Sequence, residues 1–375
     1  CGYCDFNSYV VEDRSVHDTF LEALERELAA SWRGAPPVSV FIGGGTPSLL
    51  RPDLWERLLG HLGATFGLTP DTEFTVECNP ETVTPELMAT LKAGGVNRVS
   101  VGAQSFNPRH LTTLERHHDP DNVARALELA AAAGITRLSL DLIFGIPGQT
   151  LAEWGNDLDR ALALGITHIS CYALTYEPGT AMTRRLELGQ FEAIDEDTEA
   201  DMFELTLARL QEAGLARYEI SNFARPGQAC RHNLVYWRQG QWLAAGPSAS
   251  GHAGGFRWKN VPRLGDWMAG VRGDLDGTVG ASPITDLEYP DPRRAFAERL
   301  LMGLRLTEGV PLPEIDASVL ALGSRRLPEI VARHVKAGLM TADGEALRLT
   351  DAGFLIADTV IGDLVRAVLD VDTGA

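Results

Sequence analysis

The sequence predicts an α/β fold: a parallel sheet covered by helices forms an open, partial barrel, and a smaller C-terminal domain resembling a winged helix follows. Apolar, β-rich runs alternate with helical patterns at intervals of a few tens of residues, as in repeated strand–helix units. The runs read as continuously apolar, which is typical of parallel strands buried on both faces. About five such units are present, too few for a complete eight-fold barrel.

The elements of the barrel follow in order along the first half of the chain. The predicted strands cover residues 38–42, 73–78, 98–103, 137–144 and 168–174. The predicted helices between them cover residues 53–62, 85–93, 121–133 and 151–162. For the third helix, Asp119 and Pro120 precede its first turn and Gly134 follows its last residue, which are typical helix boundaries.

Beyond residue 175 the alternation becomes irregular. We expect a long helix at 196–213, a short strand at 216–220 and a functional loop, rich in Gly and Trp, at 221–255. A strand at 347–350 and a final helix at 352–369 complete the C-terminal domain. The predicted division is a barrel domain at 1–225, a connecting segment at 226–290 and the winged-helix-like domain at 291–375.

Composition excludes several classes of function. The formal net charge of −18 argues against nucleic-acid or anionic-membrane binding, which need a basic surface. The C-terminal part from residue 301 carries eleven acidic and seven basic residues, so its winged-helix pattern does not indicate DNA binding. Five cysteines, an odd number, fit a reducing compartment, and we expect a cytoplasmic protein. Because residue 1 is cysteine rather than methionine, we expect a preceding segment that holds the first strand.

The pair Cys1-Gly2-Tyr3-Cys4 is a C-x-x-C motif, which serves zinc, redox or iron–sulfur chemistry. A structural zinc site would need a second pair of ligands, and no second C-x-x-C is present. A thioredoxin-like site would need the pair at a helix N-terminus after a strand. The pair alone leaves the iron–sulfur and redox alternatives open.

With these cysteines, the chain resembles the radical SAM superfamily, and within it the HemN/HemW branch, over essentially its whole length. The superfamily motif is C-x-x-x-C-x-x-C, so the resemblance implies that Cys1 and Cys4 are its second and third cysteines, with the first upstream of residue 1. Three thiolates then hold three irons of a [4Fe–4S] cluster, and the fourth iron stays open to S-adenosylmethionine (SAM). Tyr3 would pack near the adenine.

The resemblance also implies the SAM-binding residues. A glycine-rich turn after the first predicted strand, on its own, is no more than a tight loop that allows close backbone approach; in the family it contacts the SAM amino group. Glu77 would bind the same amino group, Arg116 the carboxylate, and Gln104 and Asp141 the ribose hydroxyls, roles that suit their donor and acceptor chemistry. Singly, each would more often be a solvated or capping residue. The full set carried over is Tyr3, Gly44, Gly45, Thr46, Glu77, Gln104, Arg116 and Asp141.

Two further features concern haem. In the HemN oxidases a cysteine lies two positions after the third cluster cysteine, whereas this chain has Phe6. The segment from Cys230 to Trp237 contains the pattern H-N-x-x-Y, which the HemW resemblance associates with haem binding through His232 and Tyr236. Imidazole and phenolate are both known axial ligands, although an isolated loop histidine is more often structural. His252 or Cys230 could be the ligand instead, and Asn233 would hold the loop.

Three functions stay open. The first is a haem chaperone that binds haem and delivers it to acceptor haemoproteins, respiratory ones among them, with an electron donor such as a flavodoxin. The second is an oxygen-independent coproporphyrinogen III oxidase. The third is a radical SAM enzyme with another substrate. Phe6 and the H-N-x-x-Y pattern favour the chaperone. Cys78 and Cys171, within predicted strands, are expected to be buried and to act as small apolar residues.

Overall fold

The computed structural model describes residues 2–6, 13, 15–31, 34–273 and 282–370. Its centre is a seven-stranded sheet in the order β1-β2-β3-β4-β5-β7-β6. The first five strands are parallel and each pairs with the next, whereas β7 is antiparallel to both β5 and β6. The strands are β1 Ser39–Ile42, β2 Glu73–Cys78, β3 Arg98–Gln104, β4 Arg137–Phe144, β5 His168–Ala173, β6 Ala216–Arg217 and β7 Asn222–Ala224. The predicted open, parallel α/β sheet is confirmed.

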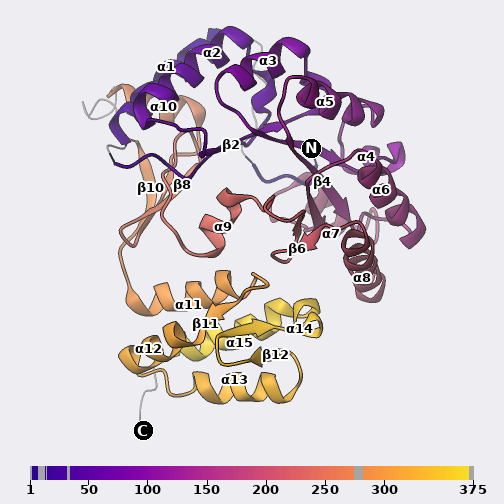
Figure 1. Ribbon diagram of the computed structural model, residues 1–375, viewed down its shortest axis with the longest axis vertical. Helices are drawn as coiled ribbons and strands as arrows, with labels where there is room; N and C mark the ends of the chain where they lie inside the picture. Colours follow the sequence, from indigo (N-terminus) through magenta and orange to yellow (C-terminus); the bar gives the residue numbers. More distant parts are fainter. Residues whose placement is uncertain (1, 7–12, 14, 32–33, 274–281, 371–375) are drawn as a thin grey trace.

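Helices cover the outer face of this sheet and form an arc around it (Figure 1). Local signals set their ends: Pro52 opens α2 and left-handed Gly67 closes it, while Thr150 and Glu153 form a capping box at α6. The strands and helices predicted up to residue 174 are found, most with ends shifted by a residue or two. The helices of this part are α1 Ser15–Ser31, α2 Pro52–Phe66, α3 Pro85–Ala93, α4 Pro108–Thr113, α5 Asp121–Ala132, α6 Leu151–Ala163, α7 Ala181–Glu187 and α8 Glu196–Glu212.

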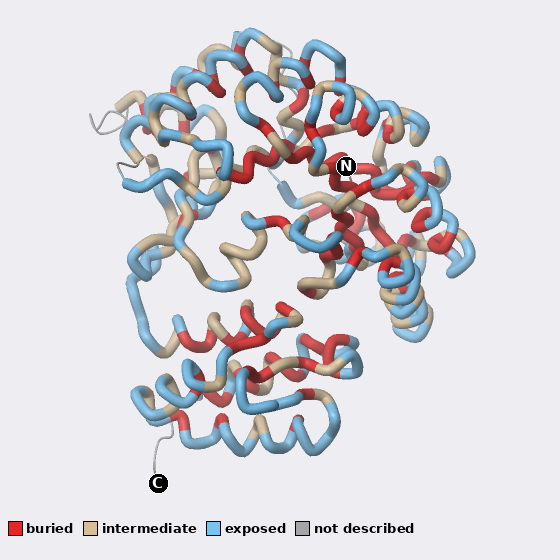
Figure 2. The backbone as a smooth tube through the Cα atoms, viewed as in Figure 1, coloured by how far each residue is buried: buried red, intermediate tan, exposed pale blue. Residues whose placement is uncertain are grey.

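The two faces of the sheet differ in polarity, contrary to the prediction of continuously apolar strands. Residues facing the helices, such as Val76, Val101 and Leu140, are apolar and belong to the main core. Their neighbours along the strands, such as Ser100 and Asp141, are polar and line a cavity. Cys78 and Cys171 are buried in the main core, as predicted. Figure 2 shows the burial concentrated on the strands and on the inner sides of the helices. The inner face is polar because it surrounds a cavity rather than a packed core.

The segment predicted as a loop at 221–255 contains regular structure, so that prediction is wrong. It includes β7, the short helix α9 (Arg231–Trp237) and strand β8 (Ser250–Ala253). Strands β8, β9 (Phe256–Asn260) and β10 (Ile284–Glu288) form an antiparallel sheet, next to α10 (Leu264–Arg272). Side chains distant in sequence hold these elements, and for that reason the local pattern did not reveal them.

Buried Glu27 of α1 ties this region to the barrel. Its carboxylate accepts hydrogen bonds from the backbone N–H of Gly246 at 2.7 Å and from the amide of Asn260 at 2.8 Å. The indole of Trp267 and the hydroxyl of Ser282 also donate to it. Burial raises the pKa of Glu27, while these four donors lower it. A carboxylate that is removed from water but fully hydrogen-bonded fixes the position of its partners.

The C-terminal elements surround a core of their own and lie apart from the arc of helices (Figure 1). The sheet order β11-β13-β12 with flanking helices agrees with the predicted winged-helix-like domain. The predicted final helix is broken at Ile356, where φ is −124° and ψ is 35°. The elements are α11 Pro292–Gly303, β11 Val310–Pro311, α12 Leu312–Leu322, α13 Leu327–Lys336, β12 Met340–Ala342, β13 Ala346–Leu349, α14 Asp351–Leu355 and α15 Ala357–Leu369. None of the described helices is both long and apolar enough to cross a membrane.

Candidate functional site

A cavity of about 540 Å³ lies against the inner face of the barrel. It extends from the carboxyl ends of the strands down to their first residues, and register pairing brings its wall residues into rows. One such row runs from Gly102 on β3 through Asp141 on β4 to Ser170 on β5. Eight of the residues proposed from sequence for the cluster and SAM line the cavity: Tyr3, Cys4, Gly45, Thr46, Glu77, Gln104, Arg116 and Asp141.

Residues 3–6 line this cavity, and the backbone of Gly2 before them is hydrogen-bonded on two sides. Gly2 donates to the carbonyl of Leu114 at 3.2 Å, and its own carbonyl accepts from Met182 at 2.9 Å. A Cβ at Gly2 would lie 2.9 Å from the carboxyl group of Glu115, so a larger residue there would require the Glu115 side chain to move. Tyr3 packs against the small apolar cluster beyond, and burial raises its pKa to about 12. Cys4 is a free thiol at the cavity, whereas Cys1 lies outside the described residues.

The glycine-rich turn after β1 brings bare backbone to this cavity at Gly45, whereas Gly43 and Gly44 line a second cavity, described below. Gly44 and Gly45 adopt left-handed φ values of 79° and 54°, and the space where their Cβ atoms would lie is open. The sequence did not single out Gly43. A Cβ there would come within 2.7 Å of the Phe41 ring and 2.8 Å of the Glu77 carboxyl group. The turn therefore needs glycine for close approach as well as for conformation.

The carboxyl groups of Glu77 and Asp141 both line this cavity, and Glu77 contacts the turn directly. Gly44 N–H donates to Glu77 Oε2 at 3.0 Å, and Ser100 Oγ lies 3.1 Å from both oxygens of Asp141. Burial, together with the charge of Asp141, raises the pKa of Glu77 to about 7. Burial also raises the pKa of Asp141, against the lowering effect of its serine partners and Arg116. In their ionised form these two buried carboxylates suit a cationic ligand.

Arg116 and Gln104 also line the cavity. Gln104 ends β3 with φ of 62°, a left-handed conformation that is uncommon for a residue with a side chain. Arg116 Nη2 donates to the carbonyl of Gly102 at 3.2 Å. A Cβ at Gly102 would lie 2.7 Å from the Gln104 amide and 2.8 Å from Arg116. Gly102 is therefore a site residue that the sequence did not indicate; it makes room for both side chains.

A second cavity, of about 710 Å³, lies beside β1. Its walls come from α1, β1, α2 and the segment 241–245, and they are mainly apolar, with Phe20, Leu58 and Trp242 among them. His232 of α9 is one of the polar residues in this wall, and Phe41 and Thr46 line both cavities. A mainly apolar cavity with a few placed polar groups is typical of a site for an organic ligand.

His232 and Tyr236, both proposed from sequence, lie one helical turn apart on α9 and touch. The His232 ring stacks on Phe41 with centroids 4.9 Å apart, and its Nδ1 lies 3.1 Å from Ser39 Oγ. Its Nε2 lies 2.7 Å from the Tyr236 hydroxyl. Burial lowers the pKa of His232 to about 4 and raises the pKa of Tyr236 to about 12. Neutral imidazole and protonated phenol are therefore the resting forms.

The alternative ligands lie differently. Cys230 lines the first cavity; its thiol donates to buried Glu73 at 3.4 Å, and burial raises its pKa to about 12. His252 Nδ1 lies 2.9 Å from the Gly240 carbonyl, and His252 is not among the residues that line either cavity. Asn233 donates to the Tyr218 hydroxyl at 3.3 Å, which holds α9 as expected of its amide.

Residues 1–161 of the chain match the radical SAM superfamily, and residues 291–356 match the HemN C-terminal domain. The structure is similar to that of the coproporphyrinogen III oxidase HemN from Escherichia coli, with a TM-score of 0.82 and 22% identity over 98% of this chain and 86% of that one. The barrel and its C-terminal partner thus define a radical SAM protein with a HemN-type fold.

Two relatives show to which family within this superfamily the chain belongs. The chain is 41% identical to the heme chaperone HemW of Mycobacterium tuberculosis over 97% of this chain and 91% of the relative. It is 33% identical to the heme chaperone HemW of Bacillus subtilis over 96% and 95% respectively. The chain belongs to the HemW family.

The cofactors of this superfamily, a [4Fe–4S] cluster and SAM, can be compared with the first cavity. Cys4 supplies one thiol, as a cluster requires. The glycine turn, the acidic pair and Arg116 offer separate partners for an ammonium, hydroxyls and a carboxylate, the polar groups of SAM. Among the described residues, no group of three or more His, Cys, Asp or Glu side chains could hold a metal ion. The residues present fit both cofactors, with further cysteine ligands to come from outside the described part.

Proposed function

We propose that this chain is a haem chaperone, which binds haem and delivers it to acceptor haemoproteins. The observation that carries the proposal is His232, a neutral imidazole in the wall of a mainly apolar cavity beside β1. Neutral imidazole is the form that binds iron, and an apolar cavity suits a tetrapyrrole. The names of the HemW relatives point to the same function.

For the haem site we propose His232 as the axial ligand and Tyr236 as its hydrogen-bonding neighbour. The raised pKa of Tyr236 disfavours a phenolate ligand, because iron would have to displace a tightly held proton. The Cys230 thiol is already hydrogen-bonded to Glu73 and lines the first cavity instead. His252 lines neither cavity. These placements favour His232 over the alternatives.

For the first cavity we propose the family roles, residue by residue. Cys1 and Cys4 bind the cluster with a third cysteine upstream. The bound cluster would supply the electron for reductive cleavage of the sulfonium group of SAM. Glu77 binds the amino group of SAM together with the glycine turn at Gly44, Gly45 and Thr46. Arg116 binds the carboxylate, Gln104 and Asp141 the ribose, and Tyr3 lies near the adenine. The placement of eight of these residues around one cavity supports this assignment.

The runner-up function is coproporphyrinogen III oxidation. Its support is the fold shared with HemN. Against it stands Phe6, which is 61% exposed at the position where the oxidase pattern has a cysteine. A phenyl ring cannot replace a thiol as ligand or acid, so we favour the chaperone.

The proposal extends to the compartment, the partners and the domain division of the protein. We propose a cytoplasmic protein that receives electrons from a donor such as a flavodoxin and passes haem to respiratory haemoproteins, without a role for nucleic acid. We propose the division 1–225, 226–290 and 291–375, in which α9 of the middle segment contacts the C-terminal part through Arg238 and Glu308.

Replacing His232 tests the haem site. We expect His232→Ala to lower haem affinity at least tenfold and to shift the haem absorption band, because an axial ligand is lost. The matched control is His252→Ala, which removes an imidazole outside both cavities and should leave affinity and spectrum unchanged. The measurement is a haem titration followed by absorption. Equal effects of the two substitutions would place the ligand elsewhere.

A further inference from the structure

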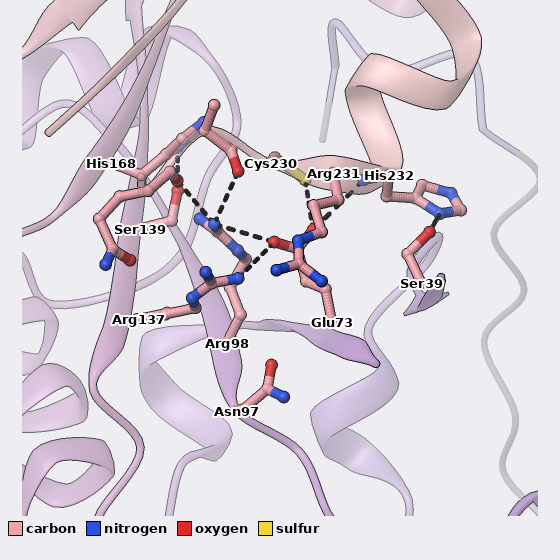
Figure 3. Close-up of polar contacts among 12 residues, drawn as sticks. Ser39, Glu73, Asn97, Arg98, Arg137, Ser139, His168, Cys230, Arg231 and His232 are labelled. Atoms are coloured by element: carbon pink, nitrogen blue, oxygen red, sulfur yellow. Dashed lines mark hydrogen bonds and ion pairs between the residues drawn. The ribbon is translucent and has the colours of Figure 1, made fainter. Parts of the chain in front are cut away.

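We propose that Ser39 and Glu73 are positioning residues that fix His232 from two sides and leave its Nε2 atom to face haem iron. The inference rests on the proposed haem function and adds residues outside the H-N-x-x-Y pattern. Ser39 on β1 and Glu73 on β2 are direct partners in the register of the parallel sheet. Figure 3 shows both beside α9, with Glu73 at the centre of a polar cluster.

Glu73 holds the backbone of the histidine. Its Oε1 accepts the N–H of His232 at 3.2 Å and the thiol of Cys230 at 3.4 Å. Cys230 is the residue before α9 and gives no side-chain cap, so the first N–H groups of this helix need another acceptor. A carboxylate from β2 supplies it across 159 positions of sequence.

The other oxygen of Glu73 is bound by two arginines. Arg98 donates to Oε2 at 3.1 Å and Arg137 at 2.8 Å, and Glu73 is only 1% exposed. Arg98 also donates to the carbonyl of Gln228 at 2.7 Å, so it fixes the chain that leads into α9. The two arginines thus neutralise the buried charge at Oε2, while Oε1 is free to hold His232.

Ser39 holds the ring. Its Oγ lies 3.1 Å from Nδ1, and the stacked Phe41, two residues along β1, fixes the ring plane. A histidine that binds a metal through one nitrogen usually donates its other N–H to a nearby acceptor, which sets the tautomer. With Ser39 as acceptor for Nδ1–H, the lone pair lies on Nε2, where the Tyr236 hydroxyl donates at 2.7 Å. Haem iron bound at Nε2 would have to displace that hydroxyl.

This arrangement predicts effects of opposite sign from the two ring partners. Ser39→Ala removes the orienting acceptor and should lower haem affinity about 10- to 100-fold, the scale for such partners of metal ligands. Tyr236→Phe removes the group that competes for Nε2 and should raise affinity about two- to tenfold. Ser39→Thr keeps the hydroxyl and should restore wild-type affinity. If these substitutions acted only through lost packing, haem affinity would fall in both Ser39→Ala and Tyr236→Phe.

The experiment is a haem titration of the full-length protein and these variants, with the haem reduction potential as a second readout. Without its acceptor, Nδ1–H makes the imidazole a weaker donor, so the potential of Ser39→Ala should rise, whereas that of Ser39→Thr should match wild type. Glu73→Gln, if it folds, should weaken binding in the same direction as Ser39→Ala. Unchanged haem affinity and reduction potential in Ser39→Ala would overturn the inference. It would also be overturned if Tyr236→Phe lowered haem affinity as much as Ser39→Ala does. If wild-type protein binds no haem, the proposed function itself fails. If it binds haem and His232→Ala has no effect, the ligand lies elsewhere and only the inference fails.

Discussion

In the full-length protein, Cys4→Ala should abolish the [4Fe–4S] cluster. The three cysteines of the motif each bind one iron, and removal of one leaves two irons without protein ligands. Cys4 is a free thiol at the first cavity, where the cluster can meet SAM. The measurement is the iron content and absorption spectrum after anaerobic reconstitution.

The matched control is Cys171→Ala. Cys171 is also a free cysteine, but it is buried in the main core, where burial raises its pKa well above the usual value. The Cys171→Ala protein should keep a full cluster and should lose only a modest amount of stability. A fully loaded cluster in Cys4→Ala would remove this residue from the ligand set.

The affinity for SAM should fall as the pH decreases from 8 to 6, and Glu77 should be the cause. Its pKa of about 7 means that about nine-tenths of the groups are ionised at pH 8 and about one-tenth at pH 6. Only the ionised form attracts the amino group of SAM. Because the proton competes with the ligand, affinity should fall roughly tenfold across this range. Titration calorimetry at several pH values measures this directly.

Two variants separate this effect from a general weakening of the site. Glu77→Gln cannot ionise, so its SAM affinity should be low at pH 8 and nearly independent of pH. Arg116→Ala should lose roughly 10- to 100-fold in affinity at pH 8, since a charge-assisted hydrogen bond is lost. Its affinity should still fall with decreasing pH, with the midpoint at higher pH because Arg116 lowers the pKa of Glu77. A wild-type affinity that does not change with pH would show that Glu77 does not bind the amino group.

Local sequence patterns were sufficient to predict most strands and helices of the barrel. The strand Arg137–Phe144 and the helix Pro85–Ala93 lie where apolar runs and caps predicted them. The same run contained the signal for its polar inner face: Ser139 and Asp141 alternate with leucines. Reading the run as continuously apolar missed that period of two, which is the mark of a strand with one polar face.

Contacts between distant residues account for what local patterns missed. Helix α9 was predicted as a loop because seven residues without a side-chain cap make a weak helix signal. Its acceptor, Glu73, is a residue of another strand. The close approaches at Gly43 and Gly102 likewise depend on Glu77 and Arg116, which no spacing near these glycines reveals. Ser39 and Glu73, the residues proposed to position His232, likewise reach it from distant parts of the sequence.

Parallel titration of the full-length, cluster-loaded protein with haem and with coproporphyrinogen III tests the chaperone function most directly. Haem binding is followed by absorption, and porphyrinogen turnover is followed in the presence of SAM and a reductant. We expect tight haem binding, transfer of haem to an added apo-haemoprotein, and no protoporphyrinogen. Formation of protoporphyrinogen without haem binding would contradict the proposed function and would identify an oxidase.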